Sequence, residues 1–249
     1  MRLTVIGPGQ AGTAIHQHAC AAGIDSTLVR SYEGHADVVI LAVPDHAIAE
    51  VAAAIPEGPA VGMLAGALPL DLLRPHVRRF ALHPMQTIQA NRNDLQLTGC
   101  TAGITASDDD TAALAADLAQ QLSMRPLVVP EQARPLPHIA CVFASNLLVA
   151  PLIAAMRTLQ AAGIDADPRE VLGPLALRAV ENTLADGLSA VPTGPLARGD
   201  YRTIVSHRAA LQAIDPDLDE LYVRLSQTTL PLISPLAAAA VQPVLETIA

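Results

Sequence analysis

The stretch that decides the fold is residues 2–12, RLTVIGPGQAG, near the start of the chain. Residues 2–6 are rich in apolar and β-branched side chains, which is typical of a strand. Three glycines follow with the spacing G-x-G-x-x-G, and the apolar residues after them recur at helical intervals. A strand, a glycine turn and a helix in this order predict the first βαβ unit of a doubly wound sheet.

Each glycine of the turn has its own physical reason. Gly7 permits the tight turn, Gly9 lets the backbone approach a diphosphate, and Gly12 lets the helix pack closely against the strand. The helix N-terminus adds free N–H groups and a partial positive charge, so we expect the turn to bind a dinucleotide diphosphate. A glycine turn without a ligand is the alternative. The predicted contact residues are Gly7, Pro8, Gly9, Gln10, Ala11 and Gly12.

Six further runs rich in apolar residues alternate with helical patterns along the first half of the chain. They span residues 25–30, 36–43, 61–66, 79–84, 100–106 and 125–130. The run 36–43 is continuously apolar after Asp37, which is typical of a central parallel strand, and Asp45 behind it is expected to cap the next helix. Alternating strands and helices predict a doubly wound parallel sheet, the Rossmann architecture.

The composition changes at residues 130–137, PEQARPLP, which contain three prolines. This stretch predicts a boundary between a Rossmann domain of residues 1–130 and an all-α domain of residues 131–249. No strand pattern follows it. The predicted helices span residues 138–162, 168–186, 200–213, 217–233 and 236–248. The fold class is therefore α/β, with a helical second domain.

Charge and composition exclude several classes of function. The formal net charge of −9 opposes nonspecific binding to nucleic acid or to an anionic membrane. All 15 basic residues are arginine, so the chain has no lysine. Schiff-base chemistry, a Walker-type phosphate lysine and a lysine general acid are therefore excluded. Small molecules are the expected partners.

The cysteines and the N-terminus indicate a cytoplasmic protein without a metal site. Cys20, Cys100 and Cys141 are far apart and odd in number, and they show no C-x-x-C spacing. We therefore expect buried thiols rather than metal ligands or disulfides. This use of cysteine fits a reducing compartment. The apolar run of residues 2–6 is too short for a signal peptide.

Residues 139–156 contain no charged side chain and nearly reach the length of a membrane span. Ser145, Asn146 and Pro151 interrupt this stretch, and it lacks basic flanks of one sign. We therefore expect a helix that is buried between domains or subunits, and no membrane partner. A membrane span is the alternative.

The end of the second predicted strand indicates which dinucleotide binds. An NAD site usually has an acidic residue there, whose carboxylate binds the 2′-hydroxyl of the ribose. This chain has Arg30 and Ser31, followed by Tyr32. A cation and a hydroxyl suit a 2′-phosphate, so NADP is favoured over NAD. A solvated surface arginine is the alternative for Arg30, and Glu33 lies past the strand end.

Small residues at two more strand ends complete the predicted cofactor crevice. Ala42, Val43 and Pro44 end the third strand, and we expect them to line the adenosine or the diphosphate. Ala65 and Gly66 end the fourth strand, where their small size leaves room for nicotinamide. Both positions follow the rule that ligands bind at the carboxyl ends of strands in open α/β sheets.

Histidine is the natural acid or base in a chain without lysine. His83 follows the fifth strand in HPMQT, residues 83–87, at the crevice side of the sheet. His138 begins the first predicted helix of the second domain, and Asn146 lies eight residues later on broadly the same face. Structural roles are the alternatives: a strand-end contact for His83, and a contact between helices for His138 and Asn146.

A second polar cluster, TGPLARGD, occupies residues 193–200. Arg198 can bind a substrate carboxylate in a bidentate manner or reach a cofactor phosphate. Asp200 is expected to N-cap the next helix. His207 lies seven residues after Asp200 on a similar face, and it is a further catalytic candidate. A surface position without a catalytic role is the alternative for His207.

Five features together carry a family resemblance: GPGQAG, AVPD, HPMQT, the helix with His138 and Asn146, and TGPLARGD followed by His207. With them the chain resembles the Rossmann-like predicted oxidoreductases of the 6-phosphogluconate dehydrogenase C-terminal-like superfamily. More narrowly, it resembles the branch whose second domain is catalogued as of unknown function. The likeness covers essentially the whole chain, and the combination of HPMQT with TGPLARGD is its most specific part.

The resemblance implies an NADP-linked reductase or dehydrogenase, a homodimer formed through the C-terminal helices, and a small 2-keto acid such as ketopantoate as substrate. Better-known members carry a catalytic lysine one turn before the helix asparagine, whereas this chain has Val142 there. We therefore expect His138 or His83 to transfer the proton, Asn146 to orient the carbonyl and Arg198 to bind the carboxylate. A non-catalytic NADP sensor and a structural dimer with a decayed cofactor site are the alternatives.

Overall fold

The computed structural model describes residues 1–90 and 94–246, and the chain forms two compact units. The N-terminal unit spans Met1–Asn146, and the C-terminal unit spans Leu147–Ala249. The sequence predicts a boundary at residues 130 and 131, directly after the last strand. The N-terminal unit also includes the helix that follows, α4 (Pro135–Ala144). His138 therefore belongs to the same unit as the sheet.

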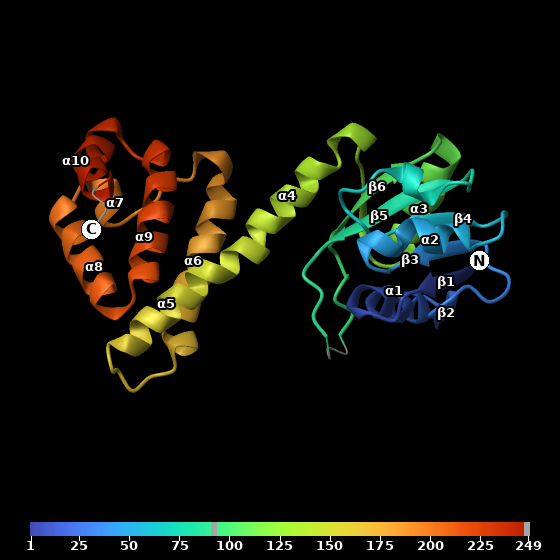
Figure 1. Ribbon diagram of the computed structural model, residues 1–249, viewed down its shortest axis with the longest axis horizontal. Helices are drawn as coiled ribbons and strands as arrows, with labels where there is room; N and C mark the ends of the chain where they lie inside the picture. Colours follow the sequence, from blue (N-terminus) through green and yellow to red (C-terminus); the bar gives the residue numbers. More distant parts are fainter. Residues whose placement is uncertain (91–93, 247–249) are drawn as a thin grey trace. The chain divides into compact units, whose positions relative to one another are not determined.

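The N-terminal unit is built on a seven-stranded sheet with the order β2-β1-β3-β4-β5-β6-β7 (Figure 1). Its strands are β1 (Arg2–Ile6), β2 (Asp25–Val29), β3 (Val38–Leu41), β4 (Ala60–Met63), β5 (Arg79–Met85), β6 (Thr101–Ala106) and β7 (Arg125–Val128). All seven coincide with the runs predicted from the sequence. β1 pairs with β2 on one side and with β3 on the other, so the strand order reverses there. The carboxyl ends of β1 and β3 therefore flank the crevice of a doubly wound sheet.

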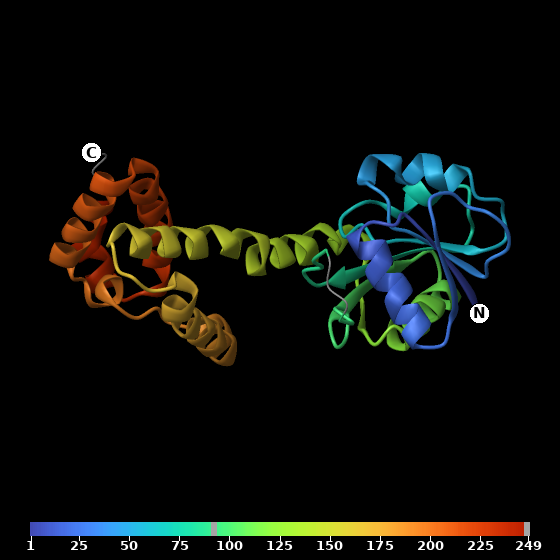
Figure 2. The same cartoon turned by 90° about the horizontal axis from the view of Figure 1, so that it is seen from below.

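Helices cover both faces of this sheet (Figure 2). α1 (Gln10–Ala21) and α3 (Asp109–Gln121) pack on one face and share one apolar core with it. α2 (Ile48–Ala53) and the 3-10 turn η2 (Leu70–Leu73) pack on the other face and share a second core. Leucine, isoleucine, valine and alanine dominate both cores, because aromatic residues make up only 2% of the chain.

Two neighbouring strands, β6 and β7, run against the predicted direction. β6 pairs antiparallel with β5, whereas every other pair of the sheet is parallel. The prediction of a parallel sheet throughout was wrong for β6 and for β7, which is parallel to β6. A parallel neighbour needs a crossover connection, usually a helix. Residues 86–90 and 94–100, the described parts of the connection, form no helix, so the chain returns beside β5 in the opposite direction.

Asp45 does not cap the helix after β3, and this prediction was also wrong. Pro44 takes the N-cap position of a 3-10 turn, η1 (Asp45–Ala47), and Asp45 is the first residue inside that turn. In the described part of the chain, no side-chain hydrogen bond caps η1 or α2. By contrast, Asp108 caps α3 by accepting a hydrogen bond from the Thr111 main-chain N–H at 2.8 Å.

The centre of the sheet contains a close contact between Gly62 of β4 and Phe80 of β5. The two residues are register partners, and Phe80 is fully buried. A Cβ atom built on Gly62 would lie only 2.4 Å from the ring of Phe80. The glycine therefore provides the room that the large ring occupies.

The C-terminal unit is helical, and residues 147–246 contain no strand. Its helices are α5 (Val149–Ala161), α6 (Pro168–Asp186), α7 (Pro195–Arg198), α8 (Tyr201–Ile214), α9 (Pro216–Thr229) and α10 (Pro235–Glu246). The helix predicted for residues 138–162 is divided into α4 and α5 by a 3-10 turn, η4 (Asn146–Leu148). The Ser145 hydroxyl donates to the Cys141 carbonyl at 2.6 Å, which competes with regular helical bonding. A Rossmann sheet with a helical second unit confirms the predicted fold class.

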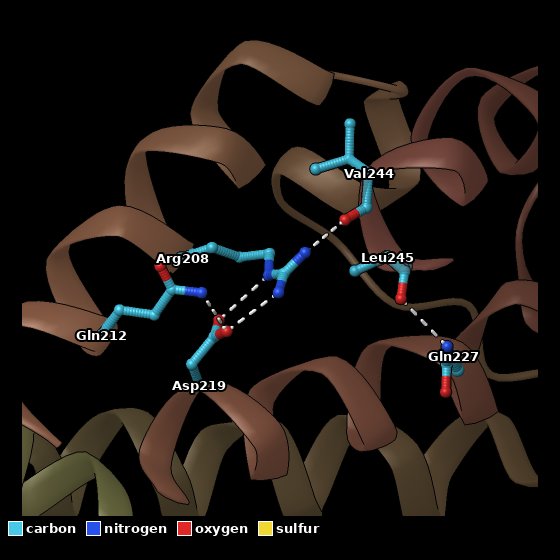
Figure 3. A network of polar contacts seen from close by, with 6 residues as sticks. All are labelled: Arg208, Gln212, Asp219, Gln227, Val244 and Leu245. Atoms are coloured by element: carbon cyan, nitrogen blue, oxygen red, sulfur yellow. Dashed lines mark hydrogen bonds and ion pairs between the residues drawn. The ribbon is translucent and has the colours of Figure 1, made fainter. Parts of the chain in front are cut away.

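A buried ion pair joins α8, α9 and α10 (Figure 3). Arg208 donates to both carboxylate oxygens of Asp219, at 3.0 and 2.9 Å, and to the Val244 carbonyl at 2.6 Å. Gln212 donates a further hydrogen bond to Asp219 at 2.9 Å. The side chains of Arg208 and Asp219 are only 11% and 7% exposed. The hydrogen bonds from Arg208 hold the pKa of the Asp219 carboxyl below its ordinary value.

The apolar core of the C-terminal unit is small. Its buried cluster consists of Ile204, Val241 and Leu245, and Leu218 and Ala237 are also buried. α5 and α6, both described throughout, contain no buried residue. Leu177 and Leu184 of α6 are 67% and 77% exposed. These helices therefore present apolar side chains that nothing in their own unit covers.

One helical stretch of the described chain, Glu131–Ala161, is long and apolar enough to cross a membrane. Its mean hydropathy is 2.2, and its most apolar window is not buried at all. Arg134 is the one buried residue of this stretch, and its other residues are exposed or half-buried.

Candidate active site

The glycine turn between β1 and α1 is open beside Gly9. Gly7 has a φ of +111°, and a Cβ atom built on it would lie 2.4 Å from the Ala42 carbonyl oxygen. A Cβ atom on Gly12 would lie 2.0 Å from the Gly7 carbonyl oxygen. A Cβ atom on Gly9, however, meets no atom of the described chain within 4 Å. The fold itself requires Gly7 and Gly12, whereas the space beside Gly9 is free for a ligand.

The first turn of α1 can offer its main-chain N–H groups to this space. Gly9 is the N-cap, and no side chain of the described residues forms a capping hydrogen bond there. The first turn also lacks acidic residues, so no carboxylate of this turn repels an anion. Pro8, Gly9 and Gln10 are exposed. Free amides at the positive end of a helix suit a diphosphate.

The predicted cofactor residues of β2 and β3 lie at the same edge of the sheet as this turn, because β1, β2 and β3 are parallel. The Gly7 main-chain N–H donates to the Val29 carbonyl at 2.9 Å, directly before Arg30 and Ser31. Arg30 and Ser31 are exposed. The Arg30 guanidinium has no hydrogen bond or ion pair with residues 1–90 or 94–246. Its charge is therefore available to a ligand.

The residues after β3 line the other side of the crevice. The Ala42 main-chain N–H donates to the Ile6 carbonyl at 2.8 Å, so this residue is fixed beside the end of β1. Ala42 and Val43 are half-buried, and Pro44 is exposed. The structure thus brings the predicted residues of three strand ends to one edge of the sheet.

Two histidines meet beyond the end of β4. His83 lies within β5 and pairs with Gly103, so its predicted position after the fifth strand was wrong. The rings of His83 and His138 have centroids 5.3 Å apart and planes at 64°. The His83 Nδ1 lies 3.2 Å from the Leu64 carbonyl oxygen. Because a carbonyl only accepts, Nδ1 carries the proton of neutral His83, and Nε2 presents a lone pair. A Cβ atom built on Gly66 would lie 2.6 Å from His138 Nδ1 and 2.9 Å from His83 Nε2. The space expected to leave room for nicotinamide beside Gly66 therefore holds the two imidazoles.

Each of these histidines has one buried nitrogen without a partner. Within the residues that the structure describes, His83 Nε2 and His138 Nδ1 form no hydrogen bond. Burial lowers the pKa of His83, and the positive charges of His138 and Arg134 lower it further, against the effect of the Leu64 carbonyl. Buried polar atoms without partners are uncommon and call for an explanation such as a bound ligand.

A cavity of about 510 Å³ lies against the His83 and His138 rings. Asn146 also lines this cavity, together with Cys141 and Gln86. Asn146 is exposed, and its Oδ1 accepts a hydrogen bond from the Ser145 hydroxyl at 3.1 Å. No charged side chain of the described residues lines the cavity. Three of the predicted site residues thus line one cavity whose walls carry no charged side chain and are partly apolar.

Sequence reasoning missed Arg134. Its side chain is buried, and its guanidinium donates to the main-chain carbonyls of Ala65, at 2.6 Å, and Leu68. The nearby Glu131 accepts a hydrogen bond from the Leu70 main-chain N–H at 2.9 Å. Both charged residues belong to the proline-rich stretch that was interpreted as a domain boundary. Two charged side chains inside such a stretch were the only signal.

The remaining predicted residues, Arg198 and His207, lie in the C-terminal unit. Asp200 caps α8 through the Thr203 main-chain N–H at 3.2 Å, which confirms its predicted role. Arg198 is exposed at the end of α7. His207 Nδ1 lies 3.1 Å from the Tyr222 hydroxyl, and both residues line a separate apolar cavity of about 600 Å³. Tyr222 therefore gives His207 a partner within its own unit.

Several solved structures share this fold. A provisionally assigned NADP oxidoreductase from Bacteroides fragilis has a TM-score of 0.79 at 23% identity, over 92% of this chain and 97% of that one. A protein from Thermotoga maritima has a TM-score of 0.69 at 21% identity, over 91% and 97%. The reductive aminase from Aspergillus terreus, in complex with NADPH and ethyl-5-oxohexanoate, has a TM-score of 0.70 at 17% identity, over 98% and 99%. At these identities the likeness establishes the fold alone.

The family of the chain is given by its sequence. A search of curated proteins finds no match. Residues 100–229, more than half of the chain, match a family described as a domain of unknown function, DUF2520. This match confirms the resemblance to the branch whose second domain has no assigned function. The chain therefore belongs to the DUF2520 family.

Proposed function

We propose that the chain is an NADP-dependent oxidoreductase that reduces a small carboxylated carbonyl compound, such as a 2-keto acid of the ketopantoate type. The observation that carries the proposal is the pair of unpartnered, buried nitrogens of His83 and His138. They lie at the carboxyl edge of the same parallel strands whose first turn is open beside Gly9. A phosphate-binding turn and a proton-transfer pair at one sheet edge are the parts that a reductase of this fold needs.

The residues of the crevice fit a phosphorylated dinucleotide. The amides at the start of α1 would hold the diphosphate, and Gly9 leaves the space for it. Arg30 and Ser31 would bind the 2′-phosphate, for which a guanidinium and a hydroxyl are suitable partners. The presence of NADPH in the similarly folded reductive aminase supports this choice of nucleotide.

The two histidines have different proposed roles in proton transfer. Bound NADPH would supply a hydride to the carbonyl carbon, so the carbonyl oxygen must receive a proton. His83 keeps its own proton on Nδ1, bound to the Leu64 carbonyl, and so its Nε2 can only accept. We therefore assign proton delivery to His138 Nδ1, and His83 Nε2 would accept a hydrogen bond from the hydroxyl group that forms on the reduced carbon. Asn146 would add a hydrogen bond from its amide.

A carboxylate on the substrate needs a cation from outside this cavity, because no charged side chain of the described residues lines it. Arg198 is our candidate. It is exposed, and its guanidinium forms no hydrogen bond or ion pair within the described chain. A bidentate contact to a carboxylate would use its planar fork.

A second copy of the chain is the proposed cover for the apolar helices. α5 and α6 expose long apolar side chains, including Leu177 and Leu184. Exposed patches of this kind mark protein or membrane interfaces. The homodimer that the family resemblance implies would bury them, and it would also cover the apolar stretch Glu131–Ala161.

Calorimetric titration with NADPH and NADH tests the nucleotide site. Gly9→Ala should keep the fold, because its Cβ meets no protein atom, but it should weaken NADPH binding by filling the diphosphate space. Arg30→Ala should weaken NADPH about 10- to 100-fold, the value of a charged hydrogen bond, and leave NADH nearly unchanged. Arg2→Ala, at the opposite edge of the sheet, is the control. An Arg30 variant that binds NADPH normally would remove the argument for NADP.

Oxidation of NADPH in the presence of 2-keto acids, aldehydes and imines tests the chemistry. With the best substrate, His138→Ala and His83→Ala should lower kcat about 100-fold or more and change NADPH affinity little. His16→Ala is the control, because His16 bonds Ser26 of β2 and does not line the cavity. Unchanged turnover in both variants would reject the assignment. NADPH binding without oxidation across the panel would favour the sensor, and no dinucleotide binding would favour the structural dimer.

A further inference from the structure

We propose that Arg134 is a positioning residue of the candidate active site, whose guanidinium holds residues 64–68 against His83 and His138. The inference rests on the proposed function, in which the two histidines that lie against Gly66 of this loop act on the substrate. It concerns only residues of the N-terminal unit. Arg134 touches neither of the free imidazole nitrogens, so it would act through the loop.

The contact itself is a two-point clamp. Arg134 is 3% exposed, and its Nη2 donates to the Ala65 carbonyl at 2.6 Å while its Nη1 donates to the Leu68 carbonyl. Both carbonyls belong to the one loop that follows β4. A planar guanidinium presents such donors in a fixed geometry, which an ammonium group cannot reproduce. Glu131 fixes the end of the same loop through the Leu70 main-chain N–H.

The clamped loop carries Gly66, which lies against both histidines. Gly66 lies between the two clamped carbonyls in sequence, and its Cα faces both unpartnered nitrogens. His83 holds the start of the loop through the Leu64 carbonyl. Arg134 stands four residues before His138 at the beginning of α4, so the same helix end sets both the clamp and the proton donor. Loss of the clamp would let the loop move relative to both imidazoles.

The charge of Arg134 has a second effect at this place. Burial lowers the pKa of His83 most, and the charges of His138 and Arg134 lower it further. Cys141 is the other titratable group that lines the cavity, and no carboxylate of the described residues lines it. Glu131 interacts with Arg134 itself. Arg134 therefore favours a neutral His83 with an accepting Nε2, the form that the proposed reaction needs.

Two substitutions separate geometry from charge. Arg134→Lys keeps the positive charge but loses the planar guanidinium that donates to two carbonyls at once. Arg134→Met removes both the charge and the donors. Arg74→Met removes an exposed arginine of the same unit and is the matched control, with wild-type behaviour expected. The pKa of His83 is measured by NMR titration of the imidazole signals, identified with His83→Asn. In the folded variants, it should rise in Arg134→Met and stay near the wild-type value in Arg134→Lys. No substrate is needed for this measurement.

Measurement of kcat in the two Arg134 variants is the second part of the test. Both Arg134 variants should lower kcat about 10- to 100-fold, because displacement of a reactive group by about 1 Å can cost this much. The Kd for NADPH should change less than about threefold, since the glycine turn is untouched. Full activity in Arg134→Lys would overturn the clamp, and an unchanged His83 pKa in Arg134→Met would overturn the electrostatic effect. If no compound is reduced by the wild-type protein, the proposed function fails while the NMR titration still decides the role of Arg134.

Discussion

The two units differ in how far their apolar residues are buried. In the N-terminal unit, every residue of β3 and β4 is buried. In the C-terminal unit, α5 and α6 have no buried residue over their described length. A sheet with helices on both faces completes its own core, whereas an uncovered layer of apolar helices does not. The first unit buries its apolar strands by itself. In the second unit, we propose that another copy of the chain covers the exposed apolar helices.

The largest expected effect comes from a charge on the uncovered helices. In a twofold dimer, Leu184→Glu enters the interface twice. Each buried, unpaired carboxylate costs roughly 3 kcal/mol, so the dimer should weaken by about 6 kcal/mol, or about 10⁴-fold in Kd. Sedimentation velocity measures the change. Val77→Glu is the matched control, because Val77 is 79% exposed on the N-terminal unit and Leu184 is 77% exposed. A monomeric wild type, or a variant that stays dimeric, would contradict the comparison.

The next largest effect concerns the fold of the C-terminal unit itself. With so small an apolar core, the unit depends on the buried pair of Arg208 and Asp219. Asp219→Ala should destabilise it by about 3–5 kcal/mol, because Arg208 is left charged and buried. Urea unfolding gives the value. Glu220→Gln, which removes an ion pair with Arg224 at 71% and 70% exposure on the same helix, should cost less than about 1 kcal/mol. An equal decrease in the free energy of unfolding in both variants would show that burial of the ion pair does not determine its contribution to stability.

Mild acid should affect the two units differently, and this is the smallest expected effect. His18 is buried, and its Nε2 accepts the Leu97 main-chain N–H at 3.0 Å. Burial lowers the pKa of His18 below 6.5, so its contribution is complete above that pH and is lost as the pH falls towards the folded-state pKa. The lowered pKa values in the described C-terminal unit include those of Asp167 and Asp219, whose contributions are lost only below their ordinary pKa of 3.8.

Thermal unfolding between about pH 7 and pH 5 tests this difference. The transition of the N-terminal unit should move to lower temperature, and His18→Asn should flatten that dependence. The transition of the C-terminal unit should move less. A C-terminal transition that falls more steeply over this range would contradict the prediction.

The sequence predicted the strands because each one is a short apolar run between turn residues. It did not predict the direction of β6, because the pattern of residues 100–106 is the same in either direction. Direction depends on the connection from β5, which lacks a crossover helix in its described parts. Asp45 was misplaced for a local reason, since Pro44 took the cap position.

The candidate site was predicted only in part for a physical reason of its own. His83, His138 and Asn146 could be selected as polar residues at strand ends or on one helix face, and the structure brings them to one cavity. Arg134 could not be selected, because its role depends on main-chain carbonyls more than 60 residues earlier in the chain. Every residue has a main-chain carbonyl, so the sequence does not show which carbonyls accept hydrogen bonds from Arg134. The carboxylate anchor Arg198 and the catalytic role of His207 stay predictions.

The contact between Gly62 and Phe80 has a consequence for how this family can diverge. Since a methyl group at position 62 would overlap the ring at position 80, the two sites cannot drift independently. In evolution, Phe80 must first be replaced by a smaller residue, and only then can Gly62 be replaced by a larger one. The reverse order passes through a chain whose central strands are forced apart. Within the family, a side chain at position 62 should therefore always occur together with a smaller residue at position 80.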